Sequence, residues 1–326
     1  MRYRTIPRTS LVVSAVCLGT AGQGILNTDA EAFAVFDRYL DLGGNFFETA
    51  RVYSDWVPGE RGRSERILGD WLAARKVRDQ IVLSTKGGHP IIGVPDVTWL
   101  PRLSPAELAI DVAASLAALR TDRIDLYYLH RDDPSVPVSE IIDTLERFVA
   151  QGSIRYYACS NWSPQRIAQA MRYAQSRQAT GFVANQVEWH LALQHATPMG
   201  YADCLVHTNE TETVMQEHCI AAIPHSAQAN GFFSKLAAGG AAREKALQTR
   251  FATPPNVALG QRLHELAQRH GVPIETLVLG FFAASPLTVI PAVGPHRIDH
   301  LEATMAAITT PLTPACLQDL ADAQVG

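Results

Sequence analysis

The chain has 326 residues, of which 47% are hydrophobic and 18% charged, so it holds enough apolar material for a sizeable core. Its net charge of -4 lacks the basic excess typical of nucleic-acid binding, and no apolar run is long enough to cross a membrane. Five cysteines without CxxC spacing indicate reduced thiols and a cytoplasmic protein. We expect residues 1–326 to form a single domain.

Short apolar runs alternate with segments of helical period along the chain. Residues 1–13 predict a short hairpin that closes the bottom of the sheet that follows. Eight later runs have the continuous apolar character of strands buried on both faces. They are residues 13–19, 44–48, 81–86, 124–130, 154–160, 181–186, 221–226 and 287–293.

Between these runs, apolar residues recur with the period of an amphipathic helix. We expect helices at residues 28–43, 64–76, 104–120, 137–152, 163–177 and 256–271. Strands that alternate with helices predict a parallel sheet covered by helices. Eight units favour an α/β fold of the (β/α)8 barrel type, and an open doubly wound sheet is the alternative. Two segments, 87–103 and 190–210, are long enough to be binding loops.

Polar residues stand where the predicted strands end. These strand-end residues are Glu48, Lys86, His130, Ser160 with Asn161, Gln186, His225 with Ser226, and Gly294. All strands of a barrel run in the same direction, so these ends meet at one rim, where barrel enzymes place their active sites. The pattern predicts an active site there, although each residue could also be an ordinary strand end.

Four of these positions suit carbonyl chemistry when they are taken together: Glu48, Tyr53, Lys86 and His130. A tyrosine is a weak acid, with an ordinary pKa of about 10. A lysine ammonium nearby favours the phenolate, and a carboxylate beside the lysine keeps it charged and oriented. A tyrosine hydroxyl and a histidine N–H can together polarise a carbonyl oxygen while a hydride reaches the carbon. Taken singly, Tyr53 could be a loop aromatic, Glu48 and Lys86 a structural ion pair, and His130 a core histidine.

Other sites are not supported by the sequence. The run HRDDP at 130–134 lacks the asparagine that a kinase catalytic loop needs, and GTAGQG at 19–24 lacks GxGxxG spacing. The eleven histidines show no HExxH spacing, so no metal is expected.

The order and spacing of these motifs resemble the aldo-keto reductases over essentially the whole chain. Residues 3–20 are similar to that family's hairpin and first strand, and FFETARVY is similar to its signature around the tyrosine. IVLSTK and IDLYYLH are similar to the strands that carry its lysine and histidine. ACSNW, ANQ, IPHSAQANGFFS and VIPAVGPHRIDHLEA resemble its cofactor-binding segments.

The resemblance implies a (β/α)8 fold and reversible reduction of an aldehyde or ketone by hydride transfer from NAD(P)H. It makes Tyr53 the general acid, Lys86 and Glu48 its tuning pair, and His130 the residue that orients the carbonyl. NADP(H) is favoured over NAD(H). The implied cofactor-binding residues are Gly19, Thr20, Ser160, Asn161, Gln186, His225, Ser226, Gln228, Gly231, Gly294, His296 and Arg297.

Three positions depart from the family pattern. Glu48 stands in place of an aspartate, His225 in place of a stacking tyrosine, and His296 in place of an arginine that binds the 2′-phosphate, with Arg297 next to it. Two alternatives stay open. Glu48 and His225 suggest a nicotinamide-binding sensor or regulatory subunit on the same fold. The same tyrosine, lysine, glutamate and histidine could instead serve proton transfer in a non-redox isomerase or lyase that acts on a sugar carbonyl.

The substrate is expected to be a small carbonyl compound. Four tryptophans in or near the rim segments are candidate contacts for a sugar or an aromatic aldehyde: Trp56, Trp99, Trp162 and Trp189. One or two of them could instead be packing residues.

Overall fold

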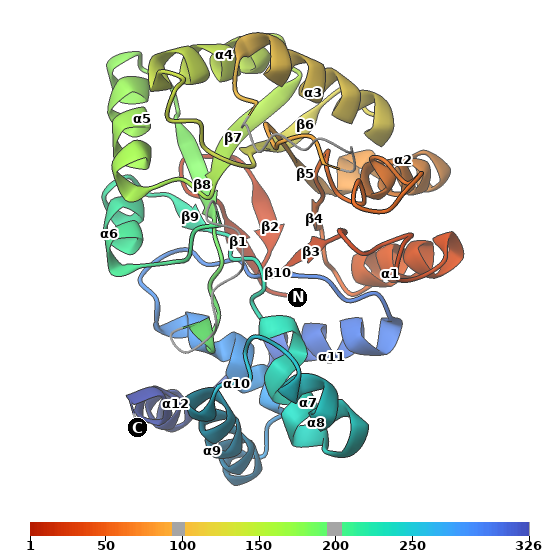
Figure 1. The fold of residues 1–326 in the computed structure, drawn as a ribbon, viewed down its shortest axis with the longest axis vertical. Coiled ribbons are helices and arrows are strands. Elements are labelled where there is room, and N and C mark those ends of the chain that lie inside the picture. Colours follow the sequence, from red (N-terminus) through yellow and green to blue (C-terminus); the bar gives the residue numbers. More distant parts are fainter. Residues whose placement is uncertain (93–101, 194–203, 326) are drawn as a thin grey trace.

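The structure, a computed structural model, describes residues 1–92, 102–193 and 204–325. A parallel sheet of eight strands, in the order β10-β3-β4-β5-β6-β7-β8-β9, curls at its centre, and helices surround it (Figure 1). The strands are β3 (Cys17–Gly19), β4 (Phe46–Glu48), β5 (Val82–Gly87), β6 (Ile124–Leu129), β7 (Ile154–Ser160), β8 (Phe182–Gln186), β9 (Ala221–Ala222) and β10 (Ala292–Val293). Each lies within a run predicted as a strand or extends one residue beyond it.

The last strand segment closes the sheet into a barrel. On one side, Ile290 N donates to Ala222 O (2.8 Å), and Ala222 N donates to Thr288 O (2.9 Å). On the other side, Ala292 pairs with Cys17 of β3 in parallel register. One segment therefore bonds to both the first and the seventh barrel strand, which confirms the predicted barrel over an open sheet.

The six predicted helices are present: α1 (Asp29–Asp41), α2 (Arg63–Arg75), α3 (Pro105–Leu119), α4 (Val138–Ala150), α5 (Pro164–Ser176) and α9 (Pro254–His270). Thr28 and Ser104 begin α1 and α3 with capping boxes, in which Glu31 and Glu107 bond back to the cap. The structure adds α6 (Asn209–Glu217), α7 (Phe232–Ala238), α8 (Gly240–Leu247), α10 (Ile274–Gly280), α11 (Ile298–Thr309) and α12 (Pro314–Val325).

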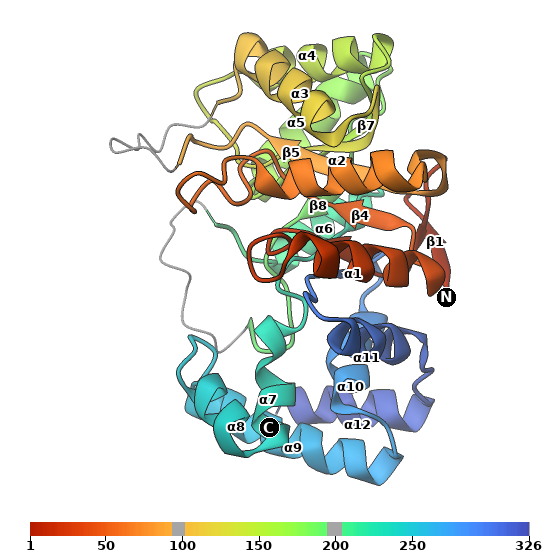
Figure 2. The ribbon, with the colours of Figure 1, turned by 90° about the vertical axis from the view of Figure 1, so that its right-hand side faces the viewer.

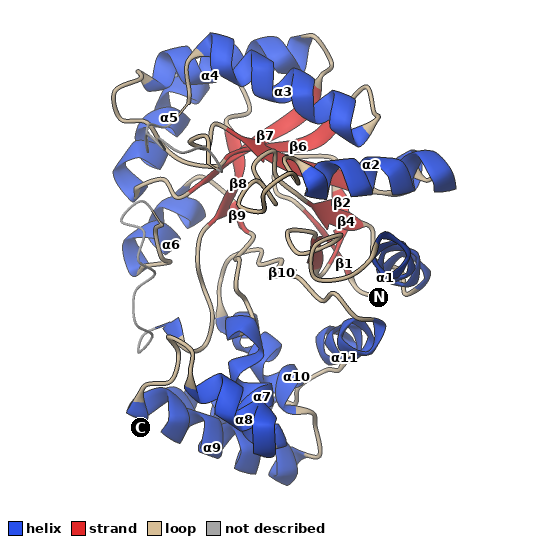
Figure 3. Ribbon diagram, turned by 45° about the vertical axis from the view of Figure 1, so that its right-hand side comes forward, coloured by secondary structure: helices blue, strands red, loops and turns tan. Residues whose placement is uncertain are grey.

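Apolar side chains pack on both faces of the curled sheet. One layer fills the inside of the barrel, and the other lies between the strands and the helices around them, which are blue in Figure 3. Phe46 belongs to the apolar cluster inside the barrel, whereas Phe47, the next residue, packs against Phe36 of α1 and Trp71 of α2 outside it. Adjacent strand residues point to opposite faces, so this division follows from the strand geometry.

The predicted hairpin consists of β1 (Tyr3–Thr5) and β2 (Val12–Ser14), which pair antiparallel. Ile6, Leu11 and Val13 join the apolar cluster inside the barrel. The hairpin therefore fills the amino-terminal end of the barrel, as expected.

A second apolar cluster holds the C-terminal helices together. Residues of α7, α8, α9, α10 and α12 contribute to it, and Phe281 packs against both this cluster and the main core. Figure 2 shows these helices stacked along one side of the barrel. Within the described ranges, no helix is both long and apolar enough to cross a membrane.

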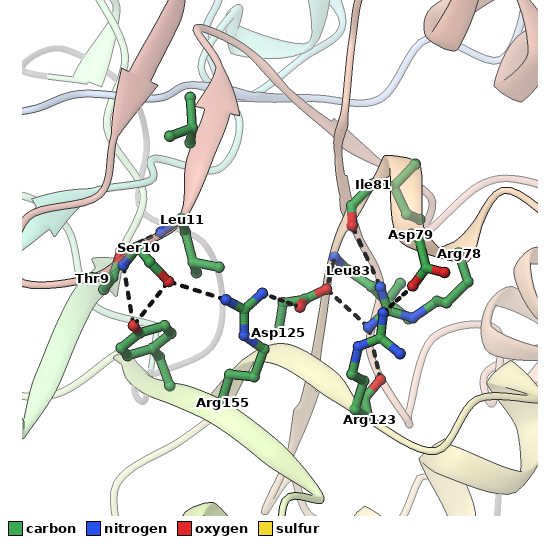
Figure 4. Close-up of polar contacts among 12 residues, drawn as sticks. Thr9, Ser10, Leu11, Arg78, Asp79, Ile81, Leu83, Arg123, Asp125 and Arg155 are labelled. Atoms are coloured by element: carbon green, nitrogen blue, oxygen red, sulfur yellow. Dashed lines mark hydrogen bonds and ion pairs between the residues drawn. The ribbon is translucent and has the colours of Figure 1, made fainter.

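A buried carboxylate ties the hairpin to three barrel strands (Figure 4). Asp125 of β6 accepts a hydrogen bond from Leu83 N (2.9 Å) and forms ion pairs with Arg78 and Arg155 (both 2.9 Å). Arg155 also donates to Ser10 Oγ in the hairpin turn (3.0 Å). The Asp125 carboxylate thus forms ion pairs with two guanidinium groups and links β5, β6, β7 and the hairpin.

We predict that Asp125→Ala lowers the free energy of unfolding by about 3–5 kcal/mol, because it leaves the largely buried Arg78 charge without its carboxylate. Urea denaturation measures this change. The matched control is Asp70→Ala, which removes an exposed pair with Arg120 and should cost about 1 kcal/mol or less. Equal losses in the two variants would contradict this role of the buried network.

Candidate active site

The parallel register brings the predicted strand-end residues to one rim. Gly19 of β3 pairs with Glu48 of β4, and Glu48 pairs with Ser84 of β5. Further round the barrel, Ser160 of β7 pairs with Gln186 of β8. Because the strands are parallel, these residues share the carboxyl end of the barrel, away from the hairpin.

Lys86, Glu48 and Tyr53 form one hydrogen-bonded group. The Lys86 ammonium is fully buried, and it contacts the Glu48 carboxylate. It donates to Tyr53 Oη at 2.8 Å and to the backbone oxygen of Thr49 at 3.2 Å. Tyr53 in turn donates to Glu48 Oε1 at 3.2 Å. The structure thus brings three members of the predicted tetrad into direct contact.

Burial and charge act in opposite directions on this group. Burial raises the pKa of Tyr53, and the charge of Arg131 opposes that rise. Burial lowers the pKa of Lys86, while the adjoining Glu48 carboxylate favours the charged ammonium. The hydrogen bond from Lys86 to Tyr53 would favour the phenolate once the phenol gives up its proton.

His130 lies beside this group. Its ring centroid is 5.7 Å from that of Tyr53, with the two rings nearly perpendicular, and His130 Nδ1 has no hydrogen-bond partner among the described residues. Burial, followed by the charges of His89 and Lys86, holds the pKa of His130 well below its usual value. The imidazole is therefore neutral at pH 7, with one N–H donor and one acceptor nitrogen.

The longer acid at position 48 fits because Gly19 leaves room for it. A Cβ atom at Gly19 would lie 3.1 Å from Glu48 Oε2, closer than most side-chain neighbours lie. With glycine on the adjacent strand, the extra methylene of Glu48 is accommodated, and its carboxylate still reaches Lys86.

The amide side chains that follow β7 and β8 differ in how they are bonded. Asn161 donates to His130 O (3.2 Å) and Ser160 Oγ (2.9 Å), and it accepts from Leu205 N (3.0 Å). By contrast, Gln186 Nε2 is buried without a hydrogen-bond partner within the described ranges. A buried unpaired amide is costly, so Gln186 is suited to donating to a ligand.

His225 begins a turn whose backbone suits close approach by a ligand. Burial lowers the pKa of His225 to about 4, so its ring is neutral at pH 7, and Nδ1 lies 3.3 Å from Ser226 Oγ. Gln228 donates to Thr304 Oγ1 at 3.5 Å. Gly231, which precedes α7, has a φ of 73°, a conformation that favours glycine.

The segment after β10, from Gly294, lies against the loop after β3. Gln23 Nε2 donates to Pro295 O (2.8 Å), and Asn27 Nδ2 donates to His296 O (3.1 Å). Arg297 is exposed and pairs with Asp299, with one nitrogen–oxygen distance of 2.8 Å.

Three predicted site residues occupy packing positions. Thr20 is buried, and its hydroxyl bonds to Ser64 Oγ (2.8 Å) and to Glu48 O (3.1 Å). Trp162 is 1% exposed and packs edge-on against Phe182 in the core. Trp189 is also buried and stacks on His207 at 3.8 Å. All three side chains are buried, and their roles as site residues stay predictions.

Trp56 lies beside Tyr53 and is exposed. Its side chain is 51% exposed, and its ring centroid is 6.3 Å from that of Tyr53. Trp99 lies outside the described residues.

Two residues near the tetrad were not predicted. His89 has its ring centroid 4.7 Å from that of His130. Arg131 donates to His130 O (3.0 Å) and to Cys204 Sγ (3.3 Å). His89 lies three positions after Lys86, and Arg131 lies one position after His130. This closeness to predicted strand ends is the sequence feature that could have identified both residues. Among the described residues, no group of three acidic, histidine or cysteine side chains could hold a metal ion.

A closed (β/α)8 barrel with a buried lysine bonded to a tyrosine and an acid at its carboxyl rim defines an oxidoreductase of the carbonyl-reducing class. The sequence model of the Aldo/keto reductase family matches residues 15–324, and the chain belongs to this family.

Several curated relatives match nearly the whole chain. The uncharacterized oxidoreductase YrpG of Bacillus subtilis is 29% identical over 99% of this chain and 95% of its own length. Norsolorinic acid reductase stcV of Emericella nidulans is 30% identical over 97% of this chain and 79% of its own length. An aryl-alcohol dehydrogenase (NADP(+)) of Phanerodontia chrysosporium is 27% identical, covering 98% and 85%.

We predict that Glu48→Ala destabilises the protein by about 3–5 kcal/mol, because the buried Lys86 charge loses its counter-ion. Adding Lys86→Met to Glu48→Ala should recover most of that loss, since the charge itself is then removed. Urea denaturation of both variants and the parent tests this coupling. If the double variant is no more stable than Glu48→Ala, the ion pair does not have the assigned role.

Proposed function

We propose that this protein reduces an aryl aldehyde or ketone with NADPH and catalyses the reverse oxidation of the alcohol. The observation that carries the proposal is the hydrogen bond from buried Lys86 to Tyr53, with Glu48 touching both and His130 beside them. The names of two relatives, both aryl-alcohol dehydrogenases, support an aromatic substrate.

Tyr53 and His130 would act on the carbonyl oxygen. A nicotinamide cofactor held at the rim by residues such as Gln186 and His225 would provide the hydride for the carbonyl carbon. As charge develops on the oxygen, the neutral His130 N–H and the Tyr53 hydroxyl donate hydrogen bonds to it, and Tyr53 transfers its proton. Lys86 then stabilises the phenolate left on Tyr53, and Glu48 keeps Lys86 charged.

The residues at the other strand ends fit a nicotinamide dinucleotide. Gln186 Nε2 has a free donor for a carboxamide oxygen, and the neutral His225 ring offers a planar face for stacking. Arg297 would exchange Asp299 for the 2′-phosphate. An exposed ion pair contributes little, so giving it up costs little. These features support NADP(H) over NAD(H).

The regulatory-subunit alternative rested partly on the glutamate at position 48. In the structure Glu48 contacts Lys86, and Tyr53 keeps its hydrogen bond to Lys86. This geometry favours an active reductase.

Replacing Tyr53 with Phe removes the proposed proton donor. We predict that kcat for benzaldehyde reduction falls by about 100- to 10,000-fold, the usual contribution of a general acid. The Kd for NADPH, measured by quenching of protein fluorescence, should stay within about twofold, because losing the Tyr53 hydroxyl removes at most one weak contact with the cofactor. Retained turnover in the variant would exclude Tyr53 as the acid. The regulatory alternative would be supported if the parent protein binds NADPH and no carbonyl compound that is tried leads to NADPH oxidation.

Arg297→Ala tests the cofactor preference. We predict that KM for NADPH rises about tenfold or more, because a charge-assisted contact with the 2′-phosphate is lost, while KM for NADH changes little. Arg38→Ala is the control, because it removes another exposed arginine, paired with Glu302, and should leave both values unchanged. An equal rise for the two cofactors would contradict the assignment.

A further inference from the structure

A cavity of about 390 Å³ lies at the amino-terminal end of the barrel. Arg2, Tyr3, Arg4 and Ala15 of the hairpin region line it, together with residues from α10 and its continuation, the end of α11 and the start of α12. The proposed catalytic residues stand at the carboxyl ends of the strands. The cavity is therefore at the opposite end of the barrel from that site. In Figure 2 the N-terminus and β1 mark this end.

One part of the cavity wall is apolar. Leu279, Phe282, Leu287, Val289, Leu312 and Leu317 contribute to it. The volume lies within the range of small-molecule sites, about 300–1,000 Å³. An occupant with a hydrocarbon portion would therefore gain by leaving water.

The charged residues of the cavity are all positive. Arg2 and Arg4 line it, and none of the described residues lining it is acidic, although the chain as a whole carries a net charge of -4. Arg2 is held by Ile308 O (3.3 Å) and Thr309 O (3.2 Å) at the end of α11. Arg4 pairs with Val13 through the backbone of the hairpin, and its side chain makes no hydrogen bond or ion pair with the described part of the chain. Its guanidinium is thus available to an anion.

A buried hydroxyl in the wall also lacks a partner. Thr276 of α10 lines the cavity and is 1% exposed, and its Oγ1 has no hydrogen-bond partner among the described residues. Leaving a buried hydroxyl unpaired is unfavourable. Other buried threonines of the structure, such as Thr144 and Thr85, are hydrogen-bonded. The Thr276 hydroxyl is therefore a buried group next to the cavity that is unpaired within the described part of the chain.

We propose that this cavity binds an amphiphilic carboxylate of the medium-chain fatty acid type. The hydrocarbon chain lies against the apolar wall, and the carboxylate pairs with Arg4 at the mouth. A small inorganic anion would leave the apolar wall exposed to water, and a neutral lipid would leave Arg4 unpaired. A molecule with both parts fits the apolar side chains and pairs with Arg4.

The test is calorimetric titration of the full chain with decanoate, in the absence and presence of saturating NADPH. Decanoate should bind in both cases with the same affinity, because the cavity and the proposed catalytic rim are at opposite ends of the barrel. Decanol should bind about tenfold more weakly or worse, since it lacks the charge that pairs with the guanidinium.

Two variants locate the site. Arg4→Glu reverses the charge at the mouth, and Ala283→Trp places a large ring at an exposed position of the lining. Each should weaken decanoate binding about tenfold or more, because one removes the ion pair and the other fills the space. Arg172→Glu, the same change at an exposed position of α5, should not. Circular dichroism and thermal melting check that the variants are folded.

Three results would overturn the proposal. They are no binding of decanoate to the parent protein, loss of binding when NADPH is saturating, and unchanged binding in both Arg4→Glu and Ala283→Trp. The second result would place decanoate at the catalytic rim.

Discussion

The site depends on one constraint, the burial of the Lys86 ammonium among the strand ends. A buried charge is costly unless it is paired and hydrogen-bonded. Here Glu48 of the adjacent strand supplies the carboxylate, and Tyr53 and the Thr49 carbonyl accept the remaining hydrogen bonds. The parallel register of β4 and β5 sets this arrangement, so the same interactions that neutralise the lysine also place the tyrosine against it.

The polar residues at the two ends of the barrel have different roles: those at the amino-terminal end stabilise the fold, and those at the carboxyl end form the candidate site. At the amino-terminal end, the hairpin fills the interior, and the buried Asp125 carboxylate joins it to three strands through ion pairs and hydrogen bonds. At the carboxyl end, the polar residues face one another around the lysine. Gly19 lies close to Glu48 there, and a side chain at position 19 would crowd the Glu48 carboxylate.

The sequence predicted the barrel because eight apolar runs and the helices between them carry a clear period. It predicted the grouping of Glu48, Tyr53, Lys86 and His130 because parallel strands bring their ends together. It did not reveal that Trp162 and Thr20 are buried, since a residue near a strand end can turn toward the core or the rim. The fit of Glu48 also depends on Gly19, a residue 29 positions away in sequence, and such a contact has no local signature.

The central claim is that the Tyr53 site serves direct hydride transfer to a carbonyl carbon. The most direct measurement uses NADPH carrying deuterium at both C4 positions of the nicotinamide, with benzaldehyde as substrate and mass spectrometry of the product. The account predicts benzyl alcohol with one deuterium on the carbinol carbon and none released to water. An unlabelled carbinol carbon would contradict it, as would carbonyl compounds that exchange hydrogen with solvent while NADPH stays unoxidised.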